Sequence, residues 1–282
     1  MDQAGRADPL IARVVGRLAP TPSGHLHLGN ALAFGAAWLS ARAAGGRLLL
    51  RVEDIDRGRA RSQVAAGQLE DLRWLGIDWD DEVTPQSRRT YPLAGIPTYR
   101  CDCPRRVRLA GGCRCRDAGK TEGAWRFRAP PGPVDFVDRA LGPQRLAPDE
   151  DPILVARDGE PAYPLAVVLD DARDGVTEVV RGADLLAATP AQIRLGEALG
   201  LAPPTYLHVP VLLGPDGKKL SKSHGSTEIR ALRAAGWTAG RVWATLLPLL
   251  GLPPGPLDPA GFDPARVRSG PFTVDERGDL RL

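Results

Sequence analysis

The chain has 282 residues, of which 43% are hydrophobic and 25% are charged, fractions that are ordinary for a globular protein. Its 37 basic and 34 acidic residues leave a net charge of +3, which permits an RNA partner without demanding one. No apolar run approaches the roughly 20 residues of a membrane span, and residues 1–16 lack the apolar core and cleavage site of a signal peptide. The composition therefore excludes a membrane-spanning protein and predicts a cytoplasmic one.

The first motif is RLAPTPSGHLHLGN, from Arg17 to Asn30. Apolar residues predict a strand at its start, prolines and Gly24 break that strand, and an Ala-rich helix is expected over 29–44. The unpaired N–H groups and the dipole of such a helix start form an anion site. Gly29 would let a nucleotide ring approach the backbone, because a Cβ there would collide with it. No Walker A pattern precedes the helix.

A buried strand over 47–52 follows and ends in the acidic run Glu53-Asp54-Ile55-Asp56. Carboxylates at the end of a parallel strand lie where open α/β sheets bind ligands. A helix over 59–75 and a loop over 76–82 complete a β-α-β-α pattern, which is typical of a nucleotide-binding fold. Between 86 and 99, prolines and a glycine leave room for little more than a turn.

The four cysteines of the chain lie within fifteen residues, at Cys101, Cys103, Cys113 and Cys115. Without an export signal, this clustering favours a metal over disulfides. Four thiolates can close a tetrahedral site, for which Zn²⁺ is the favoured ion. Such a closed site is structural, since no open position remains for catalysis. The alternative is four free thiols.

The rest of the chain predicts further strands over 125–128, 134–138, 152–157, 163–169, 176–182 and 206–213. Thr189 and Gln192 form a capping-box pattern before a helix over 190–199, with Gly200 suited to the position after it. A lysine-rich loop follows the last strand, and two helices are expected over 228–235 and 237–250, the second interrupted by a proline.

Two motifs together resemble those of class I aminoacyl-tRNA synthetases. The segment from His27 to Asn30, HLGN, is similar to the HIGH signature, and KKLSKS from Lys218 to Ser223 is similar to the KMSKS loop. The order of the two motifs and the 195 residues from His27 to Lys222 make the resemblance specific. The alternative is a proline-rich turn and an unrelated lysine-rich surface loop. The segments RLAPT, RVEDID, YPLAVVLDD and VTEVVRGADLL resemble the glutamyl members of this class.

The resemblance implies that ATP, with Mg²⁺, activates L-glutamate. As catalytic residues, His27 would donate a hydrogen bond to an α-phosphate oxygen, and Lys222 would neutralise charge that develops on the phosphates. The predicted ATP-binding residues are His27, Gly29, Asn30, Lys219, Ser221 and Lys222.

A bound glutamate needs a cation for its side-chain carboxylate, a carboxylate for its ammonium group and a polar aromatic side chain alongside. Arginine suits the carboxylate because its planar guanidinium binds it in a bidentate manner. We expect these groups at strand ends on one side of the sheet. The predicted glutamate-binding residues are Arg17, Leu18, Ala19, Pro20, Thr21, Glu53, Tyr163 and Arg181.

The resemblance also implies an α/β fold with a Rossmann-type parallel sheet. Residues 1–98 would form its first half, 99–150 a zinc-binding insertion, 151–226 the second half with the KLSKS loop, and 227–282 a short, mainly helical C-terminal segment. In the resembling family the zinc ligands are a CxC pair, a tyrosine and a later cysteine. Cys113 stands where the tyrosine would be.

Glutamate chemistry with only 56 residues after Ser226 resembles the glutamyl-Q tRNA(Asp) synthetase family, which lacks an anticodon-binding domain. That family activates glutamate without tRNA and transfers it to the queuosine base in the anticodon of tRNA(Asp). The implied partner is the anticodon arm of tRNA(Asp) bearing queuosine, and we expect a monomer. Two alternatives stay open: an adenylate-forming glutamate ligase with another acceptor, and a non-catalytic RNA-binding protein of synthetase descent.

Overall fold

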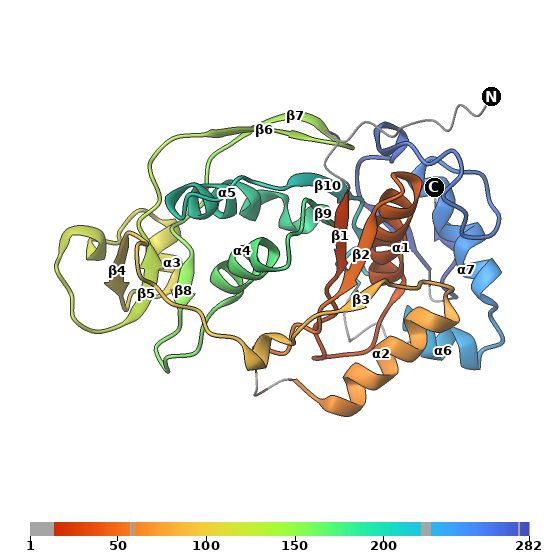
Figure 1. Ribbon diagram of the computed structural model, residues 1–282, viewed down its shortest axis with the longest axis horizontal. Coiled ribbons are helices and arrows are strands. Elements are labelled where there is room, and N and C mark those ends of the chain that lie inside the picture. The colour runs from red at the N-terminus through yellow and green to blue at the C-terminus, as the bar shows by residue number, and fades with distance from the viewer. Residues whose placement is uncertain (1–13, 57, 59, 221–226, 276, 282) are drawn as a thin grey trace, which may run out of the picture.

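The computed structural model describes residues 14–56, 58, 60–220, 227–275 and 277–281 (Figure 1). It opens with a β-α-β unit in which β1 (Val15–Leu18) and β2 (Arg47–Leu50) pair in parallel and α1 (Leu28–Ala43) connects them. The helix predicted over 29–44 is confirmed. Helix α1 is apolar around most of its circumference and packs into the main core, with only Ala43 exposed, which is typical of a helix in the interior of a protein.

The main sheet extends from this unit in both directions. On one side, β3 (Asp81–Glu82) pairs in parallel with β2. On the other side, β9 (Glu178–Gly182) lies beside β1, because the Thr177 N–H donates to the Val15 carbonyl at 2.9 Å. The sheet continues through β10 (Thr205–Val209), β6 (Val134–Asp138) and the antiparallel β7 (Gly142–Leu146). The strand order therefore reverses between β1 and β9, which is where open α/β sheets bind ligands.

The segment 163–169, predicted to be a strand, is the start of helix α4 (Tyr163–Arg173), so that prediction was wrong. Its apolar residues fit either period over so short a run. Pro164 occupies a first-turn position, where proline favours a helix. The burial pattern is helical, since 165–167 are buried together and Asp170 and Asp171 follow one turn later on the same side.

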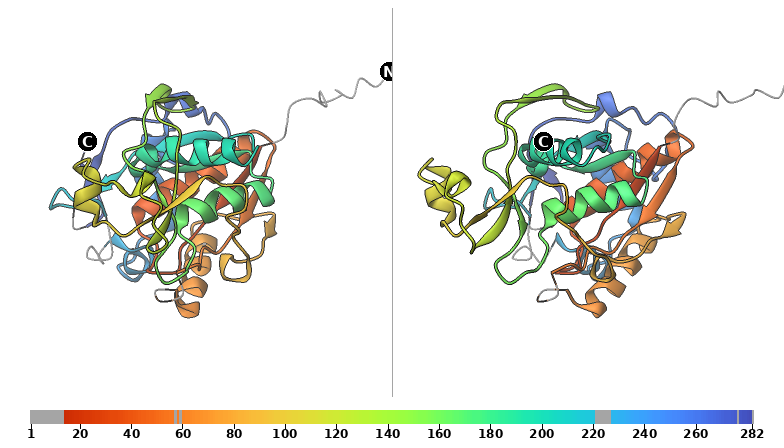
Figure 2. Two further views of the ribbon diagram at one scale, coloured as in Figure 1. Left: turned by 90° about the vertical axis from the view of Figure 1, so that its left-hand side faces the viewer. Right: turned by 60° about the vertical axis from the view of Figure 1, so that its left-hand side comes forward.

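Two further strand predictions need correction. Residues 152–157 contribute β8 (Ile153–Val155), which joins a small antiparallel sheet with β4 (Thr98–Cys101) and β5 (Ala124–Phe127) instead of the main sheet. Residues 206–213 divide into β10 and β11 (Leu212–Leu213), with Pro210 between them. We call residues 98–128 the cysteine lobe. It also contains α3 (Arg105–Leu109) and the 3₁₀ turn η2 (Cys115–Asp117), and it projects from one end of the molecule (Figures 1 and 2).

The remaining helices frame the main sheet, and none in the described part of the chain is long and apolar enough to cross a membrane. The prediction of only a turn between 86 and 99 is confirmed by the short η1. These elements are α2 (Ser62–Trp74), η1 (Gln86–Arg88), η3 (Ala183–Ala188), α5 (Thr189–Ala198), α6 (Ile229–Ala234), α7 (Ala239–Leu246), η5 (Leu247–Leu250) and η6 (Pro264–Arg266).

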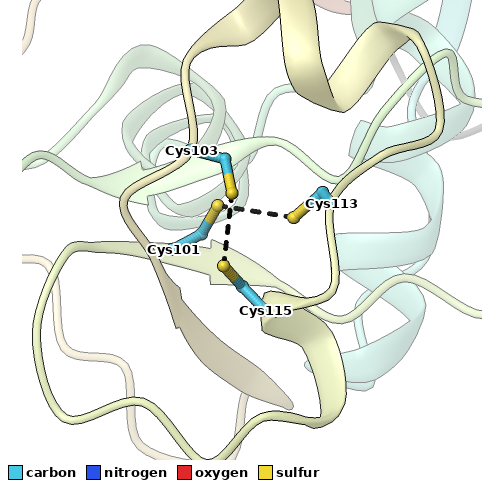
Figure 3. A group of neighbouring side chains, drawn as sticks. All are labelled: Cys101, Cys103, Cys113 and Cys115. Carbon is cyan, nitrogen blue, oxygen red and sulfur yellow. Dashed lines mark hydrogen bonds between the residues drawn. The ribbon is translucent and has the colours of Figure 1, made fainter.

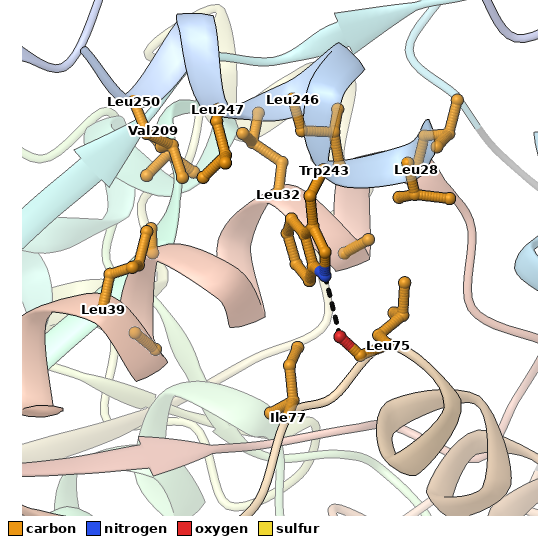
Figure 4. Packing of buried hydrophobic residues seen from close by; sticks show 14 of the residues in the cluster. Leu28, Leu32, Leu39, Leu75, Ile77, Val209, Trp243, Leu246, Leu247 and Leu250 are labelled. Carbon is orange, nitrogen blue, oxygen red and sulfur yellow. Dashed lines mark hydrogen bonds between the residues drawn. The ribbon is translucent and has the colours of Figure 1, made fainter. Parts of the chain in front are cut away.

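The C-terminal segment packs against α1. The indole of Trp243 on α7 donates to the Leu75 carbonyl at 2.7 Å and lies over Gly35, where an added Cβ would be 2.6 Å from the ring (Figure 4). The tail also forms β12 (Phe272–Val274) and β13 (Leu280–Arg281), which extend β11 into a third sheet that the sequence did not predict. Segments from the two halves of the sequence therefore share one core.

Candidate functional site

A pocket of about 420 Å³ opens at the carboxyl ends of β1 and β9, where the strand order reverses. Its volume is within the range of small-molecule sites. It gathers predicted residues that are far apart in the sequence: Arg17, Ala19, Thr21, His27, Gly29, Asn30, Glu53, Tyr163, Arg181 and Lys219.

Two predicted site residues, Leu18 and Pro20, are described but do not line this pocket. Leu18 is fully buried in the apolar core. Pro20 is not part of the pocket lining, but its carbonyl accepts the Glu53 N–H at 3.0 Å and so links the first motif to the acidic run. Ser221 and Lys222 lie outside the described residues. The lining also includes residues that the sequence analysis missed: Ala33, Phe34, Val180, Gly182, Asp184, Leu185, Pro210, Val211 and Leu212.

His27 is the N-cap of α1. Its Nδ1 accepts the Asn30 N–H at 3.3 Å, and the Asn30 Oδ1 accepts the His27 N–H at 3.0 Å. This reciprocal capping box fixes the imidazole. Because Nδ1 accepts, the neutral ring carries its proton on Nε2 as a hydrogen-bond donor. An added Cβ on Gly29 would lie 3.1 Å from the His27 ring, so in this structure the glycine makes room for the imidazole.

Arg17 and Glu53 form one wall of the pocket, and both are almost fully buried. The Arg17 Nη1 donates to the Val180 carbonyl on β9 at 3.0 Å. Burial raises the pKa of Glu53, while the positive charges of Arg51 and Arg17 act in the opposite direction. Burial is the largest of these effects, so the pKa of Glu53 is raised overall, and the two arginines limit that rise.

Arg51 has no exposed surface and holds α4 against β2. Its guanidinium contacts Asp171 at 2.6 Å, Asp174 at 2.8 Å and Glu53 at 3.2 Å. Burial acts to lower the pKa of Arg51, but these carboxylates outweigh it and raise the pKa. The group is therefore a permanent cation at the centre of a buried network. Since Asp171 and Asp174 belong to the end of α4, the network also sets the position of Tyr163 at its start.

Arg181 at the end of β9 is held by three buried side chains. Its Nη1 donates to Gln192 Oε1 at 2.7 Å, its Nη2 to Thr189 Oγ1 at 2.8 Å, and its Nε to His208 Nε2 at 3.1 Å. The capping box predicted from Thr189 and Gln192 was therefore wrong: Ala188 is the N-cap of α5, and both side chains bind Arg181. The sequence analysis did not identify His208. The feature that could have pointed to it is a single histidine within an apolar strand.

The four cysteine sulfurs converge (Figure 3). The Sγ atoms of Cys101 and Cys113 are 3.7 Å apart, those of Cys103 and Cys115 are 3.5 Å apart, and all four lie within 4.8 Å of one another. A tetrahedron with Zn–S bonds of about 2.3 Å has edges of about 3.8 Å, whereas a disulfide requires about 2.05 Å. The cluster therefore matches a four-thiolate metal site and includes Cys113.

Comparison with protein-family models matches residues 13–96 and 116–255 to "tRNA synthetases class I (E and Q), catalytic domain". The interruption of this match, 97–115, contains all four cysteines. The match covers both halves of the pocket, and it confirms the class I resemblance inferred from the two motifs.

Curated relatives are similar along most of their length. The glutamyl-Q tRNA(Asp) synthetase of Nitratidesulfovibrio vulgaris is 44% identical, with 85% of this chain and 87% of the relative covered. That of Nocardia farcinica is also 44% identical, with 94% of each covered.

Solved structures share the fold. A glutamate-tRNA synthetase from Elizabethkingia anophelis superposes with a TM-score of 0.70 at 23% identity, covering 92% of this chain and 66% of that one. A glutamate tRNA ligase from Elizabethkingia meningosepticum, solved in complex with its amino acid, has a TM-score of 0.60 at 25% identity, covering 75% and 52%. The chain thus spans between half and two thirds of the length of these two proteins.

Proposed function

This chain belongs to the glutamyl-Q tRNA(Asp) synthetase family of class I synthetases, and from that premise we propose that it activates L-glutamate with ATP and transfers the glutamyl group to the queuosine base of tRNA(Asp). Family membership makes it a ligase of the aminoacyl-tRNA synthetase class. The amino acid, the nucleotide chemistry and the acceptor are the proposed parts.

One observation carries the glutamate assignment, namely the charge balance of the pocket. Its charged lining consists of Arg17, Arg181, Glu53 and the pair formed by Lys219 and Asp184, whose charges offset each other. Apart from that pair, the lining presents two cations and one anion, and the protein partners of Arg17 and Glu53, which are Asp171 at 3.4 Å and Arg51 at 3.2 Å, lie outside the lining. Free glutamate carries the complementary set, two carboxylates and one ammonium group. We assign the ammonium group to Glu53 and the side-chain carboxylate to Arg181, with Tyr163 alongside.

The α-carboxylate of glutamate would attack the α-phosphorus of ATP and displace pyrophosphate, giving glutamyl-adenylate. His27 would donate from Nε2 to an α-phosphate oxygen, next to the N–H groups at the start of α1. Lys222 and Ser221, with Gly29, Asn30 and Lys219, complete the proposed ATP site. Mg²⁺ bound with ATP would screen the phosphate charge. In the second step, a nucleophilic group of queuosine would attack the activated carboxyl and release AMP.

We assign Zn²⁺ to Cys101, Cys103, Cys113 and Cys115. Their sulfur geometry fits this ion, and a site closed by four thiolates supplies a structural cross-link without an open position for chemistry.

The test is glutamate-dependent ATP–pyrophosphate exchange, followed by labelling of tRNA(Asp) with and without queuosine. We expect exchange without tRNA, and label only on the modified tRNA, retained after removal of the 3′ end. Lys222→Ala should abolish exchange. Lys218→Ala is the matched control, because Lys218 lies in the same motif but is largely exposed.

Each part of the proposal can fail separately. Absence of glutamate-dependent exchange would contradict the activation step and favour a non-catalytic RNA-binding protein. Exchange without label on modified tRNA would favour a ligase with another acceptor. Label on unmodified tRNA that disappears with the 3′ end would indicate ordinary tRNA charging.

A further inference from the structure

A buried chain of hydrogen bonds links three neighbouring strands next to the pocket. Arg181 on β9 lies opposite His208 on β10 in the parallel register, and Asp138 ends β6, the next strand. The His208 Nδ1 is 2.7 Å from Asp138 Oδ2, and the Arg181 Nε is 3.1 Å from His208 Nε2. Asp138 and His208 are each 1% exposed, and neither lines the pocket. They can therefore act on a ligand only through Arg181.

Asp138 is anchored as an ionised acceptor. Its carboxylate accepts backbone N–H groups from Ala140 at 3.0 Å, Leu141 at 2.9 Å and His208 at 3.2 Å. Burial acts to raise the pKa of Asp138, but its hydrogen bonds with the His208 side chain and these backbone groups outweigh it and lower the pKa. An ionised carboxylate has no proton to donate, so His208 must place its proton on Nδ1.

His208 is thereby left with an unprotonated Nε2 facing Arg181. Burial lowers the pKa of His208, and the Arg181 charge lowers it further, against the raising effects of Asp138 and of Asp184 on η3. The neutral ring accepts the Arg181 Nε–H, which an imidazolium could not do.

The guanidinium of Arg181 has five N–H groups. It donates one of them from each nitrogen, from Nε to His208, from Nη1 to Gln192 and from Nη2 to Thr189. One further N–H remains on each terminal nitrogen, with only a long 3.5 Å contact from Nη2 to the Leu185 carbonyl. A carboxylate of the ligand can accept from these N–H groups, whereas the NH₂ group of glutamine would face a donor.

We propose that Asp138 and His208 are positioning residues that orient Arg181 and so set the preference for glutamate over glutamine. This inference rests on the proposed function, because it assigns Arg181 to the side-chain carboxylate.

The experiment compares His208→Asn with His208→Gln. The asparagine amide can replace Nδ1 toward Asp138 but places no atom near Arg181, whereas the glutamine Oε1 reaches the position of Nε2. Thr205→Ser, on the same strand but exposed, is the control. Readouts are the glutamate Kd by calorimetry without ATP, the KM values for glutamate and ATP, and the ratio of kcat/KM for glutamate over glutamine.

For His208→Asn we expect an increase of about tenfold or more in glutamate Kd and KM, and a similar loss of selectivity, because a buried N–H donor loses its acceptor. The KM for ATP should stay within about twofold. His208→Gln should recover glutamate binding to within about threefold of the parent protein. Asp138→Asn, which allows the other tautomer, should resemble His208→Asn and provides a second test if that variant does not fold.

Parent-like glutamate Kd and selectivity in both His208→Asn and Asp138→Asn would overturn the inference, as would a His208→Gln variant as impaired as His208→Asn. Failure of the proposed function is recognised separately, since it would be seen in the parent protein, as absent glutamate binding or absent tRNA labelling.

Discussion

The pocket and the cysteine lobe are stabilised in different ways. The pocket is formed by a sheet and a helix whose apolar side chains share one large core (Figure 4). The buried charged side chains around it form ion pairs within the protein. The cysteine lobe has almost no core of its own. Among residues 102–123, all of them described, Cys115 is the only buried residue, and α3 buries none.

This difference indicates which part of the molecule depends on a bound ligand for its stability. Apolar burial contributes about 25 cal/mol per Å² and stabilises the pocket before any substrate arrives. A loop of exposed, charged residues cannot gain enough from burial to offset its conformational entropy. In the cysteine lobe, the binding free energy of a metal would replace the missing core.

The largest expected effect is loss of the metal site. Cys103→Ala should lower the bound zinc from about one equivalent to under about 0.1, because structural zinc sites contribute about 10–16 kcal/mol of apparent binding free energy. The lobe should become protease-sensitive, while glutamate binding in the pocket persists. Elemental analysis after gel filtration and limited proteolysis measure this, with the exposed Thr121→Ala as control. Full zinc content in Cys103→Ala, or loss of glutamate binding together with the zinc, would contradict the conclusion that the two regions are stabilised in different ways.

The next largest effect is expected from a substitution beside the pocket, which should leave the cysteine lobe unchanged. Arg51→Met removes the cation shared by Glu53, Asp171 and Asp174 and leaves buried carboxylates without it. We expect a loss of about 3–5 kcal/mol in the free energy of unfolding, with unchanged zinc content. Urea denaturation and metal analysis provide the measurements. A free energy within 1 kcal/mol of the parent's would show that the network is not needed.

A smaller effect concerns pH and the base of the cysteine lobe. Burial disfavours the charge of Glu150, but hydrogen bonds from Arg108 and Arg126 outweigh it and lower the pKa of Glu150 to about 2. Because the folded pKa lies below the ordinary value of 4.5, ionised Glu150 stabilises the fold above that pH, and the contribution is lost as the pH falls toward 2.

Glu150→Gln should therefore reduce the free energy of unfolding by about 1–3 kcal/mol at pH 7 and by progressively less toward pH 2. Denaturation of both proteins at several pH values tests this. A difference that stays constant with pH would contradict the role of the charge.

The smallest effect is expected at an exposed ion pair on the β6–β7 hairpin. Arg145 and Asp135 are 2.6 Å apart and both are about two-thirds exposed. Arg145→Ala should change the free energy of unfolding by under about 1 kcal/mol and leave the glutamate KM unchanged, since solvent screens such pairs. A larger loss would mean that the hairpin supports the pocket.

The sequence predicted those parts of the fold whose signals are local. Helix α1 and the strands β2 and β9 appear as apolar runs bounded by glycine or by charge, and the cysteine cluster is visible in the spacing alone. Helix α4 was mistaken for a strand because its apolar run is short, and because the residues that settle its period, Asp170 and Asp171, find partners far away at Arg89 and Arg51.

The same limit applies to the site. Four of the five charged residues that line the pocket, Arg17, Glu53, Arg181 and Lys219, stand in motifs and were predicted, whereas Asp184 was missed. The residues that orient them could not be predicted, because the partners of Arg181 come from separate elements. His208 lies 27 residues away from Arg181, and Asp138 lies 70 residues away from His208. Thr189 and Gln192 match the local pattern of a capping box, but that prediction was wrong because both side chains accept hydrogen bonds from Arg181.

The contact between Trp243 and Gly35 bears on how this enzyme could be re-engineered. The indole occupies the space that any larger residue at position 35 would need, and it reaches past α1 to the Leu75 carbonyl. Helix α7, from the C-terminal part of the chain, thus packs against the back of the helix whose N-cap is His27. A transplanted or shortened catalytic unit would have to keep α7, or else refill that space with a side chain introduced at position 35.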